Sequence, residues 1–137
     1  MNERAGFLKL LAENEDDTTT RLVYADWLDD HGEHEEADRQ RKWPAAKEWF
    51  VRFCQKNNPS PDDPDERIIP YKELIELGRG AVEQSDGKEY WFSCGSNLTM
   101  CAALRADCRE FWENWSIVTG IPLLPDVEEK SRFSCGC

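Results

Sequence analysis

A chain of 137 residues and 15.9 kDa has the size of one domain and can bury one continuous core. Hydrophobic residues make up 39% and charged residues 33%, which excludes a disordered chain and predicts a polar surface. No apolar run is long enough to cross a bilayer, and the N-terminal run MNERAGFLKLLAENEDD lacks the uncharged core of a signal peptide. We therefore expect a cytoplasmic protein that does not act at a membrane.

The formal net charge of -11 is unevenly distributed along the chain. Residues 1–36 hold 11 acidic and 3 basic side chains, whereas the single basic block, Arg39 to Lys56, is typical of a solvated helix face. The acidic surroundings would repel a polyanion, so the sequence argues against nucleic acid as a partner. An alternative for so acidic a chain is an inhibitor or immunity-type protein that shields a basic partner.

Residues 1–56 predict a helical lobe. Near-helical spacing of apolar residues predicts a first helix capped by Asn2, and Thr18 to Thr20 supply caps for a second helix that Gly32 ends. The apolar residues of the first helix are Phe7, Leu8, Leu10 and Leu11. Those of the second are expected to share one buried face and are Leu22, Val23, Trp27 and Leu28.

A third helix begins in the charged run EHEEADRQRKW after Gly32. Pro44 either kinks this helix or begins a new one at its first turn. Its apolar face continues with Trp43, Trp49, Phe50 and Phe53.

The run TRLVYADWLDD, Thr20 to Asp30, carries the strongest pattern in the chain. Together with its flanks, over about residues 5–42, it resembles the repeat-companion domain, a short N-terminal module common in planctomycete proteins. The matching residues are Phe7, Leu8, Asp17, Arg21, Leu22, Val23, Tyr24, Ala25, Asp26, Trp27, Leu28, Asp30, Gly32 and Ala37. The resemblance implies a helical hairpin and supplies no biochemical activity. Arg39 and Gln40 stand where the family usually continues with an apolar pair.

The polar residues of this motif are typical of structural roles. Arg21 can hold a carboxylate or a helix end with its planar guanidinium, and we expect Arg21 and Asp26 to be structural rather than ligand-binding. Tyr24 is expected to give its hydroxyl to a polar neighbour.

The remainder of the chain is expected to form a linker and a second lobe rich in Cys and Trp. Residues 57–70 hold four of the seven prolines and predict the linker, and residues 71–84 predict a helix that Gly78 and Gly80 weaken. The aromatic enrichment of residues 89–94 predicts one short strand. No strong second strand follows it, and SRFSC near the C-terminus is the one candidate with which it could form a short β-hairpin. A last long helix is expected from Ser96 or Asn97 to about Thr119, followed by an irregular tail. The predicted fold is thus mainly α, with lobes over residues 1–56 and 71–137.

The chain has six cysteines, and the tetrapeptide FSCG occurs twice. Both observations raise the question of a metal site. Helical spacing in the last helix predicts a buried seam of Cys101, Leu104, Cys108, Phe111, Trp115 and Val118. Cys54, beside Phe53, is expected to be buried as well. The other three cysteines adjoin glycines and are candidate zinc ligands: Cys94, Cys135 and Cys137. The fourth ligand is Cys101, His31 or His34, and the alternatives to zinc are reduced structural thiols or a disulfide.

No catalytic motif is present. His31 and His34 lie three residues apart, as a metal-binding pair can, but Gly32 between them favours two exposed turn residues. The sequence has no H-E-x-x-H, G-x-S-x-G or phosphate-binding glycine loop. We therefore expect a non-enzymatic protein-interaction module with a protein partner. The alternatives are a zinc-binding or thiol-dependent protein that uses the C-terminal cysteines, and an acidic inhibitor or immunity-type protein.

Overall fold

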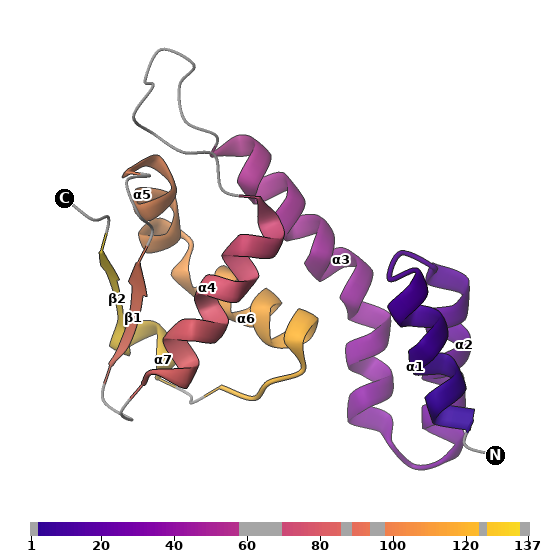
Figure 1. The fold of residues 1–137 in the computed structure, drawn as a ribbon. Helices are drawn as coiled ribbons and strands as arrows, with labels where there is room; N and C mark the ends of the chain where they lie inside the picture. Colours follow the sequence, from indigo (N-terminus) through magenta and orange to yellow (C-terminus); the bar gives the residue numbers. More distant parts are fainter. Residues whose placement is uncertain (1–2, 58–69, 86–88, 94–97, 124–125, 135–137) are drawn as a thin grey trace. The chain divides into compact units, whose positions relative to one another are not determined.

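The computed structural model describes residues 3–57, 70–85, 89–93, 98–123 and 126–134. These residues form seven helices and one two-stranded sheet, which confirms the mainly α prediction (Figure 1). The chain divides into two compact units, Met1–Lys47 and Glu48–Cys137, and each is described by itself.

The first unit consists of α1 (Glu3–Glu13), α2 (Thr18–Asp30) and the first half of α3 (His34–Lys56). Asp17 caps α2: its carboxylate accepts hydrogen bonds from the backbone N–H of Thr20 at 3.1 Å and from the Thr20 hydroxyl at 2.7 Å. These two bonds lower the pKa of Asp17. Gly32 has a φ of 78° and turns the chain into α3, which continues through Pro44.

The core of the first unit differs from the predicted one on α2. The inward face carries Arg21, Tyr24, Ala25 and Leu28, all buried at helical spacing. Leu22 and Val23 were expected on this face, and that expectation is wrong, because they are 44% and 51% exposed. Each residue of a helix turns by about 100°, so an inward Arg21 places the two residues after it on the outer faces.

Arg21 is the buried charge at the centre of the first unit, with 5% of its surface exposed. Its guanidinium donates to the side-chain oxygen of Gln40 at 2.6 Å and to the backbone carbonyl of Glu15 at 2.8 Å. The same group lies 3.7 Å from the centre of the Trp43 ring. Arg21 therefore has the structural role expected for it, and Gln40 is the polar partner that the burial of a charge requires.

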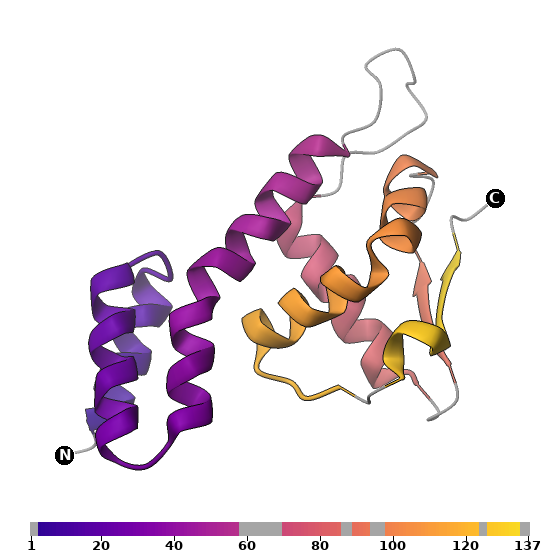
Figure 2. The same ribbon diagram turned by 180° about the vertical axis from the view of Figure 1, so that it is seen from behind.

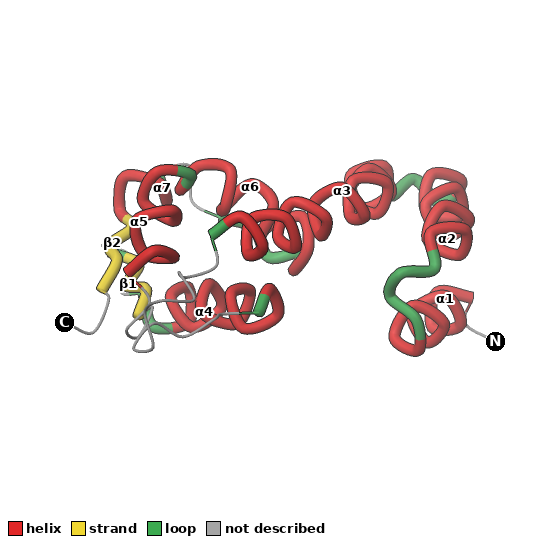
Figure 3. The backbone as a smooth tube through the Cα atoms, turned by 90° about the horizontal axis from the view of Figure 1, so that it is seen from above, coloured by secondary structure: helices red, strands yellow, loops and turns green. Residues whose placement is uncertain are grey.

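The second unit is built around a parallel strand pair. It contains α4 (Tyr71–Glu83), β1 (Tyr90–Ser93), α5 (Leu98–Ala106), α6 (Cys108–Thr119), α7 (Val127–Lys130) and β2 (Ser131–Ser134). The predicted strand and its candidate partner near SRFSC both form, and they pair with Phe92 opposite Phe133. The β-hairpin prediction is wrong because three helices separate the strands and return the chain for parallel pairing. In Figure 3 the two strands lie side by side next to α5.

The predicted last helix is in fact two helices. α5 ends at Ala106 and α6 begins at Cys108, and Asp107 between them has non-helical backbone angles of -110° and 27°. The tail expected to be irregular contains α7 and β2 (Figure 2).

The core of the second unit is aromatic and includes the predicted seam. The residues of the seam from Cys101 to Trp115 are all buried, and Val118 is partly buried. Phe50, Phe53 and Cys54 belong to this same core, so the boundary between the units falls within α3 rather than after residue 56. Residues 58–69, which make up most of the predicted linker, lie outside the described residues.

Gly78 on α4 is required by a close approach of α6. The indole N–H of Trp115 donates to the backbone carbonyl of Ile75 at 2.9 Å. A Cβ atom at Gly78 would lie 2.5 Å from that indole nitrogen, which is inside any real contact distance. Gly80, two residues further along the same helix, has open space at the corresponding position. The glycine that weakens α4 in isolation thus allows it to pack.

We predict that Gly78→Ala destabilises the protein and that Gly80→Ala does not. The added methyl must displace a fully buried indole, which costs about 1–3 kcal/mol, whereas alanine in an open helical position is neutral or stabilises by up to about 1 kcal/mol. The free energy of unfolding of both variants should be measured by urea denaturation. Equal stabilities of the two variants would contradict the packing described for Trp115.

Candidate functional site

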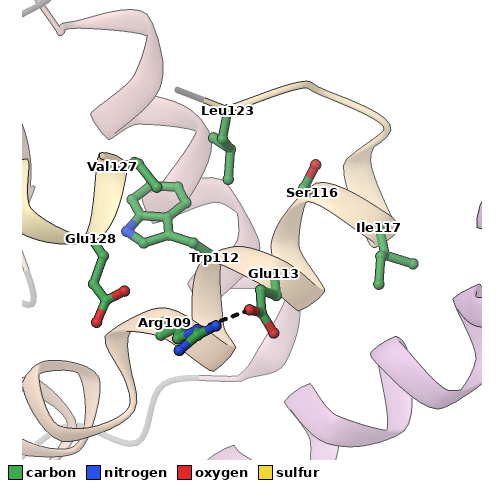
Figure 4. A pocket seen from close by; sticks show the side chains of 8 residues that line it. All are labelled: Arg109, Trp112, Glu113, Ser116, Ile117, Leu123, Val127 and Glu128. Carbon is green, nitrogen blue, oxygen red and sulfur yellow. Dashed lines mark hydrogen bonds and ion pairs between the residues drawn. The ribbon is translucent and has the colours of Figure 1, made fainter. Parts of the chain in front are cut away.

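An open pocket of about 540 Å³ lies between α6 and α7 in the second unit (Figure 4). One face of α6 supplies most of its wall, because the lining residues follow helical spacing. These residues are Arg109, Trp112, Glu113, Ser116 and Ile117. Leu123, Val127 and Glu128 complete the lining. Four residues of α6 are buried in the core: Cys108, Phe111, Trp112 and Trp115. One of them, Trp112, with 2% of its surface exposed, also reaches the pocket.

The chain reversal after α6 creates the pocket. Gly120 has a φ of 76° and ends the helix, and the Ser116 hydroxyl donates to the carbonyl of Ile121 at 2.8 Å. The reversal returns Leu123 and Val127 to the face that Trp112 presents. Because the Ser116 hydroxyl is held by a main-chain carbonyl, it serves the turn and is not an activated nucleophile.

The Trp112 ring forms a fixed floor for the pocket. Its indole N–H donates to the Ser131 hydroxyl at 2.8 Å, and that hydroxyl donates to the carbonyl of Val127 at 2.6 Å. Both polar groups are therefore satisfied in the buried interior. The ring also contacts four aromatic neighbours: Tyr90, Phe92, Phe111 and Trp115.

The rim of the pocket is charged. Arg109 and Glu113 form an exposed ion pair at 3.2 Å, and the Glu128 carboxylate lies beside them in Figure 4. Two carboxylates against one guanidinium leave the rim with an excess of negative charge. The arrangement can hold an apolar group against the partly buried Ile117 and Leu123 and a positive group at the rim.

A second pocket of about 640 Å³ shares Glu128 and lies beside the strands. Its lining includes the exposed Trp91 and the guanidinium groups of Arg105 and Arg132. Arg105 donates to the carbonyl of Phe133 at 3.1 Å, and Arg132 donates to that of Glu129 at 2.8 Å. Both arginines thus bond the main chain, which makes them part of the fold.

The predicted zinc ligands are not brought together by the described part of the chain. Cys94, Cys135 and Cys137 lie outside the described residues, and Cys101 lies in the core with 2% of its surface exposed. Among the residues that the structure describes, no group of three His, Cys, Asp or Glu side chains could hold a metal ion.

The two histidines are engaged separately. The His31 ring stacks on Trp27 with 4.0 Å between ring centres, and its Nδ1 lies 2.7 Å from the carbonyl oxygen of Trp27. The Nδ1 atom of His34 lies 2.8 Å from a carboxylate oxygen of Asp29. His31 thus contacts the last turn of α2, and His34 at the start of α3 contacts Asp29. The two Nδ1 atoms have different partners.

Several apolar side chains that the sequence pattern placed on the apolar faces of helices are exposed in the first unit. Leu8 and Leu10 on α1 are 49% and 50% exposed, in addition to Leu22 and Val23 on α2. For Leu22 and Val23 the reason is that the buried Arg21 takes the inward position on α2 that an apolar residue was expected to hold.

No protein-family model matches the chain, and no curated protein or solved structure matches it. The resemblance of residues 5–42 to the repeat-companion domain therefore stays a prediction. Within the described residues, no helix combines the length and apolar character needed to cross a membrane.

Burial raises the pKa of Cys54 to about 11 and also raises the pKa of Cys108. Both thiols are therefore protonated near neutral pH and poorly reactive. The folded state holds the Cys54 proton more tightly than the unfolded state, whose thiol has the ordinary pKa of 9.0. The stability that follows from this difference is present below pH 9 and is lost as the pH rises to about 11.

We predict that the free energy of unfolding of the protein falls more steeply between pH 9 and pH 11 than that of Cys54→Ala. The difference should approach about 2 kcal/mol across this range, since one pKa unit corresponds to about 1.4 kcal/mol. Urea denaturation at several pH values measures the free energy of unfolding of both proteins. Lys and Tyr side chains titrate in the same way in both, so the difference between the two pH profiles reports on Cys54. Parallel pH profiles would show that the Cys54 thiol is not buried in the folded protein.

Proposed function

We propose that the protein is a non-enzymatic protein-interaction module that binds its partner through the first unit. The observation that carries this proposal is the pair Leu10 and Val23, two apolar side chains about half exposed on an acidic helical hairpin. Apolar residues that no core requires are typical of interaction surfaces when they adjoin one another.

Helix geometry indicates that these two residues lie on one edge of the α1–α2 hairpin. The Glu3 carboxylate accepts the indole N–H of Trp27, which joins these two residues across the helices. Leu10 is seven residues after Glu3, and Val23 is four residues before Trp27, so each lies on the same side of its helix as the joined residue. We call the surface formed by Glu3, Leu10, Val23 and Trp27 the hairpin edge.

Charge indicates the partner of the hairpin edge. Residues 3–30 hold eight acidic and three basic side chains. Of the basic ones, Arg21 is buried and Arg4 forms an ion pair with Glu33. An apolar strip in an acidic field is complementary to an amphipathic helix with basic flanks. We therefore propose such a helix, presented by a partner protein, as the occupant.

The chemistry of the described side chains supports binding rather than catalysis. The buried thiols have raised pKa values, the Ser116 hydroxyl is held by a carbonyl, and the two histidines have separate partners. The same acidic surface would serve an inhibitor or immunity-type protein, which differs only in having a basic enzyme as its partner.

The test is the binding of a helical Leu–Lys amphipathic peptide of 18 residues, measured by fluorescence anisotropy at low salt. A Leu–Glu peptide with the same apolar face is its control. We expect the Leu–Lys peptide to bind and the Leu–Glu peptide not to bind. Leu10→Asp or Val23→Asp should weaken the binding of the Leu–Lys peptide about tenfold, because each variant loses one half-buried aliphatic contact.

Leu8→Asp is the matched control, because Leu8 has the same exposure as Leu10 and lies about 200° away around α1. It should leave binding unchanged. Equal binding of both peptides, or an equal loss in Leu8→Asp and Leu10→Asp, would refute the hairpin edge as the binding surface. Circular dichroism verifies that each variant is folded.

A zinc-binding or thiol-dependent function is the second candidate, and the strand register favours it. The parallel pairing places Phe92 opposite Phe133 and Ser93 opposite Ser134, so the two FSCG copies are aligned as far as the structure describes them. The next residue of each copy is a cysteine, Cys94 or Cys135. Cysteine thiolates are the ligands that structural zinc prefers.

We predict one zinc ion per chain in protein purified without chelators if this second candidate holds. Elemental analysis measures the metal, and titration with a thiol reagent in denaturant counts the reduced cysteines. The double variant Cys94→Ser/Cys135→Ser should lose the zinc. The control variant Cys54→Ser changes a cysteine that is buried in the core of the second unit, and it should retain the zinc. Six reduced thiols without metal would eliminate zinc.

A further inference from the structure

We infer that the pocket between α6 and α7 binds a small organic cation with an apolar body, such as a primary amine that carries an aromatic or aliphatic group. This site is separate in its residues from the hairpin edge and does not depend on the proposed function. Its volume of about 540 Å³ is within the range of small-molecule sites.

The apolar part of the ligand is accommodated by the floor. Trp112, Leu123 and Val127 line the pocket side by side in Figure 4. Trp112 and Val127 are buried, with 2% and 7% of their surfaces exposed, so the partly buried Ile117 and Leu123 supply the apolar surface that a ligand can reach. These aliphatic side chains favour a compact apolar group.

The charge of the ligand follows from the rim. Arg109 is neutralised by its ion pair with Glu113 at 3.2 Å. Among the described residues Glu128 forms no ion pair, although its carboxylate lies on the pocket wall. The nearby cation Lys130 is paired with Asp126 at 3.2 Å. The rim therefore has one negative charge for which an ammonium group is the complement.

The rim also disfavours an anion. An anionic ligand would face the carboxylates of Glu113 and Glu128. The geometry thus discriminates by charge as well as by shape.

The experiment compares three probes of similar size on the whole protein: 2-phenylethylamine, 2-phenylethanol and 3-phenylpropionate. Binding is followed by NMR through the indole N–H signal of Trp112, assigned with Trp112→Phe, and the backbone signals of α6 and α7. We expect a dissociation constant of about 1 mM for the amine, in keeping with a fragment of this size, and at least tenfold weaker binding of the alcohol and the acid.

Glu128→Gln and Glu129→Gln form the matched pair of variants. Both residues are exposed on α7, but only Glu128 lines this pocket. Glu128→Gln should weaken amine binding about tenfold and leave alcohol binding unchanged, and Glu129→Gln should bind as the unmodified protein does.

Three outcomes would overturn the inference: an amine that binds no more tightly than the alcohol, equal effects of the two variants, or signal changes that lie away from α6 and α7. Absence of amine binding at 10 mM would also overturn it. The comparison of the three probes uses the unmodified protein, so it decides the charge preference even if a variant fails to fold.

Discussion

The contact of the Trp115 indole with the backbone of α4 at Gly78 fixes the position of α6, and the second unit depends on it. Trp115 is fully buried, and its N–H group is satisfied by the Ile75 carbonyl, so a large apolar ring is packed without a polar cost. The approach is so close that no side chain fits at Gly78. With α6 held on this side, the exposed residues Arg109 and Glu113 are left to line the pocket.

The first unit solves a different problem, because a charge lies at its centre. Burial lowers the pKa of Arg21, yet the guanidinium is held by the Gln40 amide, the Glu15 carbonyl and the Trp43 ring. A buried charge with satisfied donors specifies one arrangement of its partners, since any slip leaves a donor unpaired. Because Arg21 takes the inward position, Leu22 and Val23 stay outside, so the internal charge and the exposed apolar residues of α2 have one cause.

The sequence predicted what local periodicity determines and missed what long-range packing determines. The helices before residue 84 and the seam from Cys101 to Trp115 followed from spacing, and the first strand followed from its aromatic residues. The break between α5 and α6 and the helix α7 did not follow. The parallel pairing could not follow, because it depends on how the intervening helices return the chain. The burial of Arg21 could not follow either, because a charged residue is expected outside unless its partners are known. The pocket was missed since it arises from the reversal at Gly120, which brings separated residues to one face of α6.

The two proposed sites lie in separate units, and each selects positive charge by a separate arrangement of side chains. At the hairpin edge, acidic residues surround aliphatic ones. At the pocket, a carboxylate that no described cation pairs stands beside a fixed indole. A net charge of -11 raises the local concentration of cationic ligands around the whole molecule, and salt weakens that effect. Charge alone would attract any cation, however. The apolar components, Val23 in one case and Leu123 in the other, convert this general attraction into selection of cations that also carry an apolar face.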